Sequence, residues 1–187
     1  HIFWLNSPIA EMGPKRRKPI PEEALAYIHR IACMQMNLSD AYMFLACLYS
    51  DDTTMTSFGA YSQDKASVKW FYAKRILAYI TERGNKVCIP EIQRPEIDTQ
   101  GCIQCAIDIL NMENELTEIL HDLQDVALTV KDNTTITFTK ELIYTQRRNE
   151  DRLALEIVEL RRKEKLAQEE DDKNKRRLKG TRKKPRR

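Results

Sequence analysis

The chain has 187 residues, of which 42% are hydrophobic and 32% are charged, with only 5 glycines. This composition is typical of one helix-rich domain with a sizeable core, and no apolar run approaches the roughly 20 residues that a membrane span requires. The first residues lack the pattern of a secretory signal, and an odd number of cysteines, five, favours a reducing compartment over a disulfide framework. We therefore expect an intracellular, cytoplasmic protein without a membrane partner.

Charge is distributed unevenly along the chain. The 31 Lys/Arg and 28 Asp/Glu give a net charge of +3, but residues 173–187 contain ten basic residues and no acid, which leaves 21 minus 28, or −7, on residues 1–172. This tail is either a solvated end, a nuclear-import signal or a tether to an anionic partner such as nucleic acid or an acidic protein surface. A second basic cluster, PKRRKP at 14–19, also fits nuclear import. The tail residues expected to contact an anionic partner are Lys175, Arg176, Arg177, Lys179, Arg182, Lys183, Lys184, Arg186 and Arg187.

The first half of the chain predicts two long helices. Residues 1–21 are basic, proline-rich and irregular, and a helix then begins near Pro21-Glu22-Glu23 and continues to about Ser50. Asp51-Asp52-Thr53-Thr54 indicates a turn with helix-capping residues rather than a calcium loop. The second helix runs from about Met55 to Glu82, where Arg83-Gly84-Asn85 ends it.

The second half predicts two more helices after a long connector. Residues 86–99 contain two prolines and no helical pattern. A third helix spans about Gln100 to Leu128, and Lys131-Asp132-Asn133 forms a short turn. The fourth helix begins near Thr134, and its charged extension continues to about residue 177 before a disordered end.

Loop lengths predict how these helices are arranged. A short turn makes consecutive helices antiparallel, whereas a connector of about 15 residues is long enough to return along the bundle and leave the second and third helices parallel. The sequence therefore predicts an all-α fold of two antiparallel hairpins joined by a crossover.

Three segments resemble ferritin subunits: DAYMFLACLYSDD at 40–52, TERGNKVCIPEIQRPE at 81–96 and MENELTEILHDLQDVA at 112–127. The second is the most specific, because a ferritin helix ends in an Arg-Gly-Gly turn that leads to a basic residue, proline and an acid. The resemblance covers about residues 22–163 and implies a ferritin-like four-helix bundle, with a basic segment at 1–21 before it. It leaves 164–187 as a charged helical extension and basic tail.

Ferritin subunits end in a short apolar fifth helix, but this sequence has no recognisable equivalent. No glycine follows Leu160 until Gly180, and charged residues replace the apolar ones. The resemblance alone therefore does not imply a closed cage.

Ferritin heavy chains oxidise Fe(II) at a di-iron centre inside the bundle, and the resemblance gives the corresponding positions here. Of the expected carboxylates one remains, and there is no histidine. The lysine at one of these positions carries an ammonium that repels cations and offers no lone pair. We therefore expect no ferroxidase activity and no cofactor, with iron present only within a mixed ferritin cage. The positions are Gln35, Tyr42, Val68, Lys69, Tyr72, Glu113 and Gln146.

Lys69 and Glu113 occupy places where ferritin light chains have a lysine paired with a glutamate. The resemblance thus implies a buried salt bridge between them, and the alternative is a lysine that extends to solvent. For Glu113, Gln35 and Gln146, hydrogen-bonded polar residues are one interpretation and a residual single-metal site is the other. The surface that nucleates mineral in light chains is nearly without acids here, at Asp64, Ser67, Val68, Phe71 and Lys74.

Cys102-x-x-Cys105 lies near the start of the third helix. With no second pair and no nearby histidine it is a weak zinc signal, so two half-buried thiols are the default and redox use is the alternative.

Two functions follow from these observations. The first is a catalytically inactive ferritin-like protein that is repurposed as a structural or interaction protein and binds through its surface and basic tail. The second is a non-catalytic, light-chain-type subunit that co-assembles with active ferritin subunits.

Overall fold

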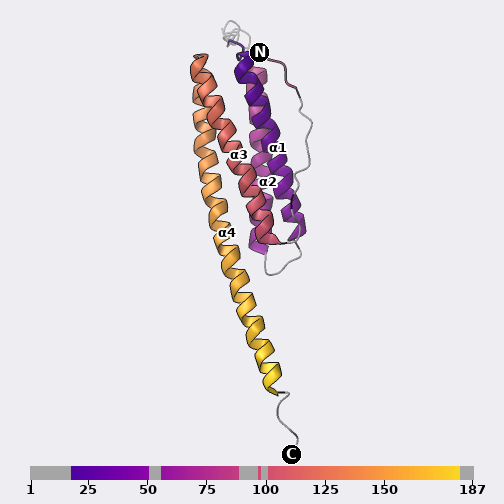
Figure 1. Cartoon of the computed structure of the whole chain (residues 1–187). Helices are drawn as coiled ribbons and strands as arrows, with labels where there is room; N and C mark the ends of the chain where they lie inside the picture. The colour runs from indigo at the N-terminus through magenta and orange to yellow at the C-terminus, as the bar shows by residue number, and fades with distance from the viewer. Residues whose placement is uncertain (1–17, 51–55, 89–96, 98–100, 182–187) are drawn as a thin grey trace, which may run out of the picture.

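The computed structural model describes residues 18–50, 56–88, 97 and 101–181, and these contain four long helices (Figure 1). They are α1 (Glu22–Leu48), α2 (Thr56–Glu82), α3 (Cys102–Thr129) and α4 (Asn133–Thr181). The four predicted helices are confirmed, with small differences at their ends: α1 stops two residues before Ser50, and α3 starts two residues after Gln100. The predicted turn at 51–54 and most of the basic cluster at 14–19 lie outside the described residues.

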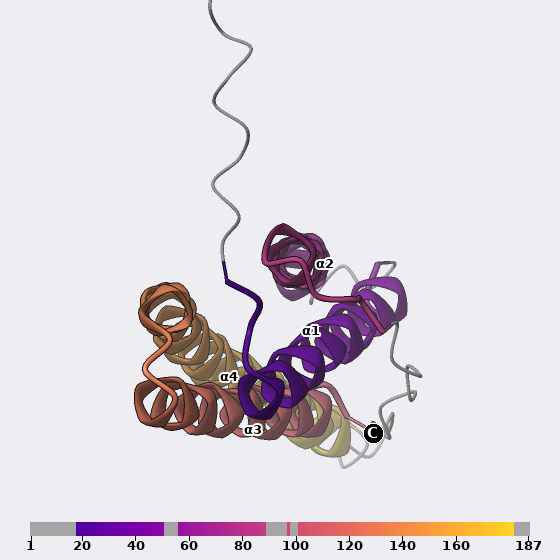
Figure 2. The same ribbon diagram turned by 90° about the horizontal axis from the view of Figure 1, so that it is seen from above.

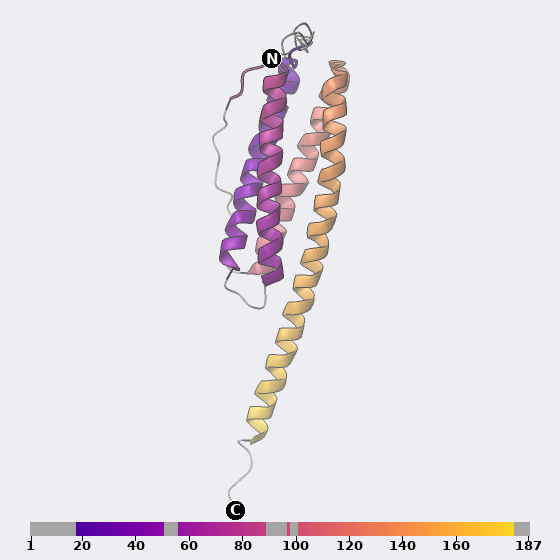
Figure 3. The same ribbon diagram turned by 180° about the vertical axis from the view of Figure 1, so that it is seen from behind.

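The helices form two antiparallel hairpins, as the loop lengths predicted. In Figures 1 and 3, α1 descends, α2 returns, α3 runs in the direction of α2, and α4 descends beside α3. The closest helix pairs are α1 with α2, α3 with α4, and α1 with α3, and the view along the bundle in Figure 2 shows α1 between α2 and α3. The seam between α2 and α4 is instead bridged by long side chains.

Apolar residues at steps of three and four explain why these segments fold against one another. On α1, for example, Ala24, Ile28 and Ile31 are fully buried, and α3 places Ile109, Leu116 and Leu120 in the same core. Burying one such Ile or Leu side chain contributes about 1.5–3 kcal/mol, so the shared core, rather than helix propensity, stabilises each helix.

Two glycines have specific roles at the helix ends. Gly84 has φ +80° two residues after the end of α2, and the next amide, that of Asn85, donates to the carbonyl of Ile80 at 3.1 Å, as in a common left-handed helix cap. Gly59 lies near the start of α2, where an added Cβ would be 3.3 Å from the carbonyl oxygen of Tyr49. Its missing side chain lets α2 begin close to the end of α1.

The fourth helix is longer than predicted. It has 49 residues against 28 in α3, or about 73 Å against about 42 Å at 1.5 Å per residue, and Figure 1 shows it projecting beyond the other three helices. Lys175, Arg176 and Arg177 are helical, as the predicted extension to about 177 implied, and Lys179 is helical too, which corrects the prediction that the disordered end starts near 177. Neighbouring opposite charges favour this continuation, since Lys175 Nζ lies 2.6 Å from Asp171 Oδ2 one turn earlier. The remaining predicted tail residues, Arg182, Lys183, Lys184, Arg186 and Arg187, lie outside the described chain.

Among the described residues one helix, α1, is long and apolar enough by length and composition to cross a membrane. No uninterrupted apolar run of this length was expected, and polar residues such as Gln35, Asn37 and Ser39 do interrupt the apolar residues of α1. The length and composition of α1 are weak support for a span, because 56% of the apolar window is buried inside the bundle, as in a core helix.

Candidate functional site

An ion pair lies in the centre of the bundle. Lys69 on α2 and Glu113 on α3 both have side chains that are 0% exposed, and the distance from Lys69 Nζ to Glu113 Oε2 is 2.5 Å. The structure thus brings together the two residues that the light-chain resemblance paired. It also excludes the alternative of a lysine that extends to solvent.

The other two helices complete this arrangement. Gln146 on α4 accepts a hydrogen bond from Lys69 Nζ at 3.2 Å and donates to Glu113 Oε2 at 2.6 Å. Tyr42 on α1 donates its hydroxyl proton to Glu113 Oε1 at 2.9 Å. We call these four residues, one from each helix, the central cluster.

Charge within the central cluster is balanced. The ammonium of Lys69 neutralises the carboxylate of Glu113, so the site presents no net charge to an incoming ion. Burial, and next the charge of Glu113, raise the pKa of Tyr42 well above its ordinary value. The phenol therefore stays protonated at neutral pH and keeps its role as a hydrogen-bond donor to Glu113.

Three of the positions implied by the resemblance stay outside the central cluster. Gln35 is buried, but its Oε1 has no hydrogen-bond partner in the described structure. Val68 is 37% exposed, and Tyr72 is half-buried with its ring edge-to-face against Phe71 at 5.6 Å. Val68 and Tyr72 therefore do not take the inward places of metal ligands that their alignment with ferritin positions implied.

The donor set of the central cluster does not fit a pair of iron ions. One carboxylate is present, and both of its oxygens already accept hydrogen bonds from Tyr42, Lys69 or Gln146. Over the described residues no group of three or more His, Cys, Asp or Glu side chains is placed to hold a metal ion. The same geometry disfavours the single-metal alternative, since Glu113 could bind a cation only by giving up these bonds.

The structure contains a second buried polar group that the sequence analysis missed, at the end of the bundle where α4 begins. Arg83 and Asp132 are 3% and 8% exposed, and the guanidinium binds both carboxylate oxygens, at 3.2 and 2.9 Å. Arg83 also donates to the hydroxyl of Tyr79 at 2.6 Å, and Asp132 accepts from the hydroxyl of Thr135 at 2.7 Å. We call Tyr79, Arg83, Asp132 and Thr135 the end cluster.

The end cluster has a structural role. Asp132 precedes the first residue of α4 and accepts from the backbone N–H of Thr135, so it caps that helix. Arg83 Nε donates to the carbonyl of Lys18 at 2.6 Å, which ties the segment before α1 to the same point. The sequence does carry a signal for the cap, because Asp132 precedes the helix and Thr135 follows three residues later. Nothing in the sequence near Asp132 or near Arg83 indicates that these two residues pair.

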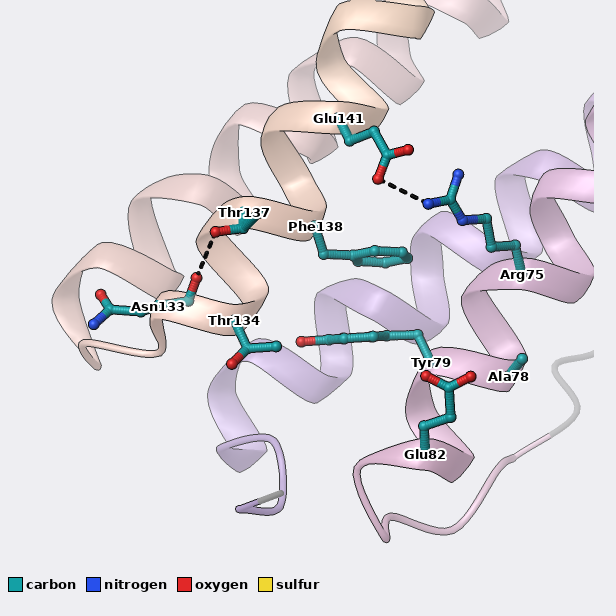
Figure 4. A pocket seen from close by; sticks show the side chains of 9 residues that line it. All are labelled: Arg75, Ala78, Tyr79, Glu82, Asn133, Thr134, Thr137, Phe138 and Glu141. Carbon is teal, nitrogen blue, oxygen red and sulfur yellow. Dashed lines mark hydrogen bonds and ion pairs between the residues drawn. The ribbon is translucent and has the colours of Figure 1, made fainter. Parts of the chain in front are cut away.

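A cavity of about 650 Å³ lies beside the end cluster, between α2 and α4 (Figure 4). The rings of Tyr79 and Phe138 stack there with centroids 4.1 Å apart, and the ion pair of Arg75 with Glu141, at 2.7 Å, crosses the same seam. Arg75 and Glu141 thus pair with each other, and the remaining charged residue that lines the cavity is Glu82.

The thiols near the start of α3 follow the default interpretation. Cys105 is buried and Cys102 is half-buried, and neither forms a disulfide bond with another described cysteine. The described chain around them holds no cluster of zinc ligands.

Surface positions on α2 are also as the sequence indicated. Asp64, Ser67, Val68, Phe71 and Lys74 are all exposed, and one of the five is an acid.

These features define a four-helix bundle with two antiparallel hairpins and a buried polar centre to which every helix contributes. A model of the family described as ferritin-like domain matches residues 25–163. The chain belongs to the ferritin family.

Individual relatives are distant. A bacterial non-heme ferritin of Staphylococcus epidermidis is 26% identical over 119 residues, which are 64% of this chain and 71% of the relative. The ferritin light chain, oocyte isoform, of Xenopus laevis is 25% identical over 113 residues, 59% of this chain and 64% of the relative. A bacterial non-heme ferritin of Staphylococcus aureus is 30% identical over 98 residues, 52% of this chain and 58% of the relative.

Proposed function

We propose that this chain is a catalytically inactive member of the ferritin family that serves as a structural or interaction protein. The observation that carries the proposal is the position of Lys69, whose ammonium lies in the bundle centre and bonds to Glu113 and Gln146. Fe(II) as a substrate needs several oxygen ligands and often a histidine, and a buried ammonium provides neither.

Iron would have to displace Lys69 before it could bind Glu113. The displaced ammonium would then be buried without a partner, which costs several kcal/mol. One remaining carboxylate cannot compensate for this, so neither an iron pair nor its oxidation is supported at the centre of the bundle.

The interaction role rests on the projecting part of α4. Lys175, Arg176, Arg177 and Lys179 are exposed on this helix, beyond the end of the bundle. Such a group of cations attracts nucleic acid or an acidic protein surface, and its binding would weaken steeply with salt.

A second candidate function is a light-chain-type subunit that co-assembles with active ferritin subunits in iron storage. The pairing of Lys69 with Glu113 favours it, because the light-chain resemblance implied that pair, and one of the relatives is named a ferritin light chain. Iron would then be held only by the mixed assembly.

Co-assembly separates the two functions. The full chain is purified alone and after co-refolding with an active ferritin heavy chain, and its molar mass is measured by light scattering coupled to size exclusion. A monomer or dimer that stays separate from the heavy chain supports the interaction protein. A large hollow assembly that contains this chain contradicts that proposal and supports the storage subunit.

Catalysis is tested separately. Fe(II) is added anaerobically to the full chain, air is admitted, and oxidation is followed by absorbance, with the active heavy chain as the positive control. We expect the rate of buffer alone, and a faster rate would refute the inactive centre whatever the assembly state.

A further inference from the structure

A second cavity between α2 and α4 concentrates positive charge. It has a volume of about 450 Å³, within the range of small-molecule sites, and lies on the same seam as the cavity of Figure 4 but further along α4. Lys65 from α2 and Arg148 and Arg152 from α4 face it, with Asn149 and a single acid, Asp151. We call it the basic groove.

Lys65 has no carboxylate partner in the described structure. It is half-buried, and its ammonium donates to Asn149 Oδ1 at 2.7 Å. Burial lowers the pKa of Lys65, and the nearby charge of Lys69 lowers it further. Glu113 already pairs with Lys69, so the hydrogen-bond partner of the Lys65 ammonium is the neutral amide of Asn149. An anion at this position would stabilise the charged ammonium more than the amide does.

The two arginines are also incompletely paired. Arg148 lies over the ring of Tyr144 at 5.9 Å and forms no ion pair with the described part of the chain. Arg152 binds Glu156 at 2.8 Å, and it still lines the groove. Three cations against Asp151 and Glu156 leave a net charge of +1 around the cavity.

The chemistry of these side chains selects a class of ligand. A guanidinium and an ammonium that converge from two helices match the oxygens of a phosphate group, and the amide of Asn149 adds a polar group beside them. The cavity volume admits an anion larger than a single phosphate.

We propose that the basic groove is a binding site for small phosphorylated anions, with Lys65 and Arg148 as the residues that hold the phosphoryl oxygens. This site is separate from the central cluster, since the two share no residue. It is also separate from the basic tail at residues 173–187.

Binding of pyrophosphate to the full chain tests the proposal. Affinity is measured by isothermal titration calorimetry at a fixed physiological salt concentration, for the wild type and for the variants Lys65→Met and Arg148→Met. Loss of one charged contact should weaken binding by about tenfold or more. Arg147→Met is the matched control, because Arg147 is the neighbouring exposed arginine on α4 and does not line the groove.

The location of binding is checked by amide chemical-shift changes in nuclear magnetic resonance spectra. We expect the shifts to centre on residues near Lys65 and Arg148. Titration with inorganic phosphate and with sulfate then distinguishes a need for two phosphates from simple attraction of any dianion.

Three results would overturn the proposal: no binding of pyrophosphate at millimolar concentration, equal affinity in all four proteins, or shifts confined to residues after 172. Equal affinity would place binding outside the basic groove, and shifts confined to residues after 172 would assign it to the basic tail. Circular dichroism melting of each variant shows whether the fold is retained, and Arg148→Met keeps the test valid if Lys65→Met proves unstable, since Arg148 is exposed.

Discussion

Tyr42 donates its hydroxyl proton to Glu113 Oε1, while Lys69 binds the other carboxylate oxygen, Oε2. Glu113 is the only carboxylate in the central cluster, and its two oxygens thus accept hydrogen bonds from donors on different helices. Together with the bond from Gln146, these bonds join α1, α2 and α4 to Glu113 of α3. One side chain of α3 thus links the two hairpins.

Lys69→Met should destabilise the protein by about 3–5 kcal/mol, because it leaves the carboxylate of Glu113 buried without its counter-ion. The double variant Lys69→Met/Glu113→Gln should recover most of this loss, since no uncompensated charge remains. Urea unfolding followed by circular dichroism gives each free energy of unfolding. Lys74→Met, an exposed lysine on the same helix, is the control and should change stability by no more than about 0.5 kcal/mol. A similar small change in Lys69→Met would show that the ion pair is not buried.

Tyr42→Phe should lower the free energy of unfolding by about 1.5–3 kcal/mol at neutral pH, because Glu113 loses a charged hydrogen bond. The folded pKa of Tyr42 is raised above the unfolded value near 10, so its contribution is complete below about pH 10 and is lost as the pH rises further. Denaturant unfolding from pH 8 upwards should therefore show the wild type losing stability above about pH 10 more steeply than the variant. Parallel curves for the two proteins would contradict this assignment.

Asp132→Asn should cost about 3 kcal/mol at neutral pH, since Arg83 remains buried without its carboxylate. Burial acts to raise the pKa of Asp132, but hydrogen bonds from Arg83 and Thr135 outweigh it and hold the pKa below its ordinary value of 3.8. The difference between wild type and variant should therefore persist above about pH 4 and shrink as the pH falls below it. Asp132→Ala should cost about 1 kcal/mol more, because it also removes the cap of α4. Acid unfolding curves that do not converge would argue against this carboxylate as the titrating group.

Gly84→Ala should destabilise the protein by about 1 kcal/mol. No atom lies within 4 Å of the added methyl group, so the cost comes from the positive φ alone. Gly180→Ala is a suitable comparison, because Gly180 lies within α4 without a positive φ and also has open space around it. It should not lower the thermal midpoint, and an equal loss in both variants would show that the backbone conformation is not the cause.

The position of each residue along its helix explains which sites the sequence could predict. Lys69 lies on the inward stripe of α2, so an alignment of that helix was enough to place it in the core. Val68 is one residue, or about 100°, away around the helix and is exposed, while Tyr72, at three residues, is offset by about 60° and is half-buried. The match to ferritin ligand positions therefore predicted that Lys69 pairs with Glu113, but it did not predict that Val68 and Tyr72 are exposed or half-buried.

The end cluster could not be predicted in the same way. Arg83 and Asp132 are 49 residues apart in the chain, and their contact depends on how the two hairpins dock rather than on the period of either helix. The basic groove has the same origin, since its cations come from α2 and α4 and meet only in the folded bundle.

The projecting part of α4 also changes how the protein should unfold. Residues 164–180 are exposed all round and have only neighbouring turns to stabilise them, so they follow a local helix–coil equilibrium with a low cost of opening. The bundle instead opens cooperatively. We therefore expect two regimes of amide exchange in one continuous helix, with slow exchange before about residue 160 and rapid exchange after it.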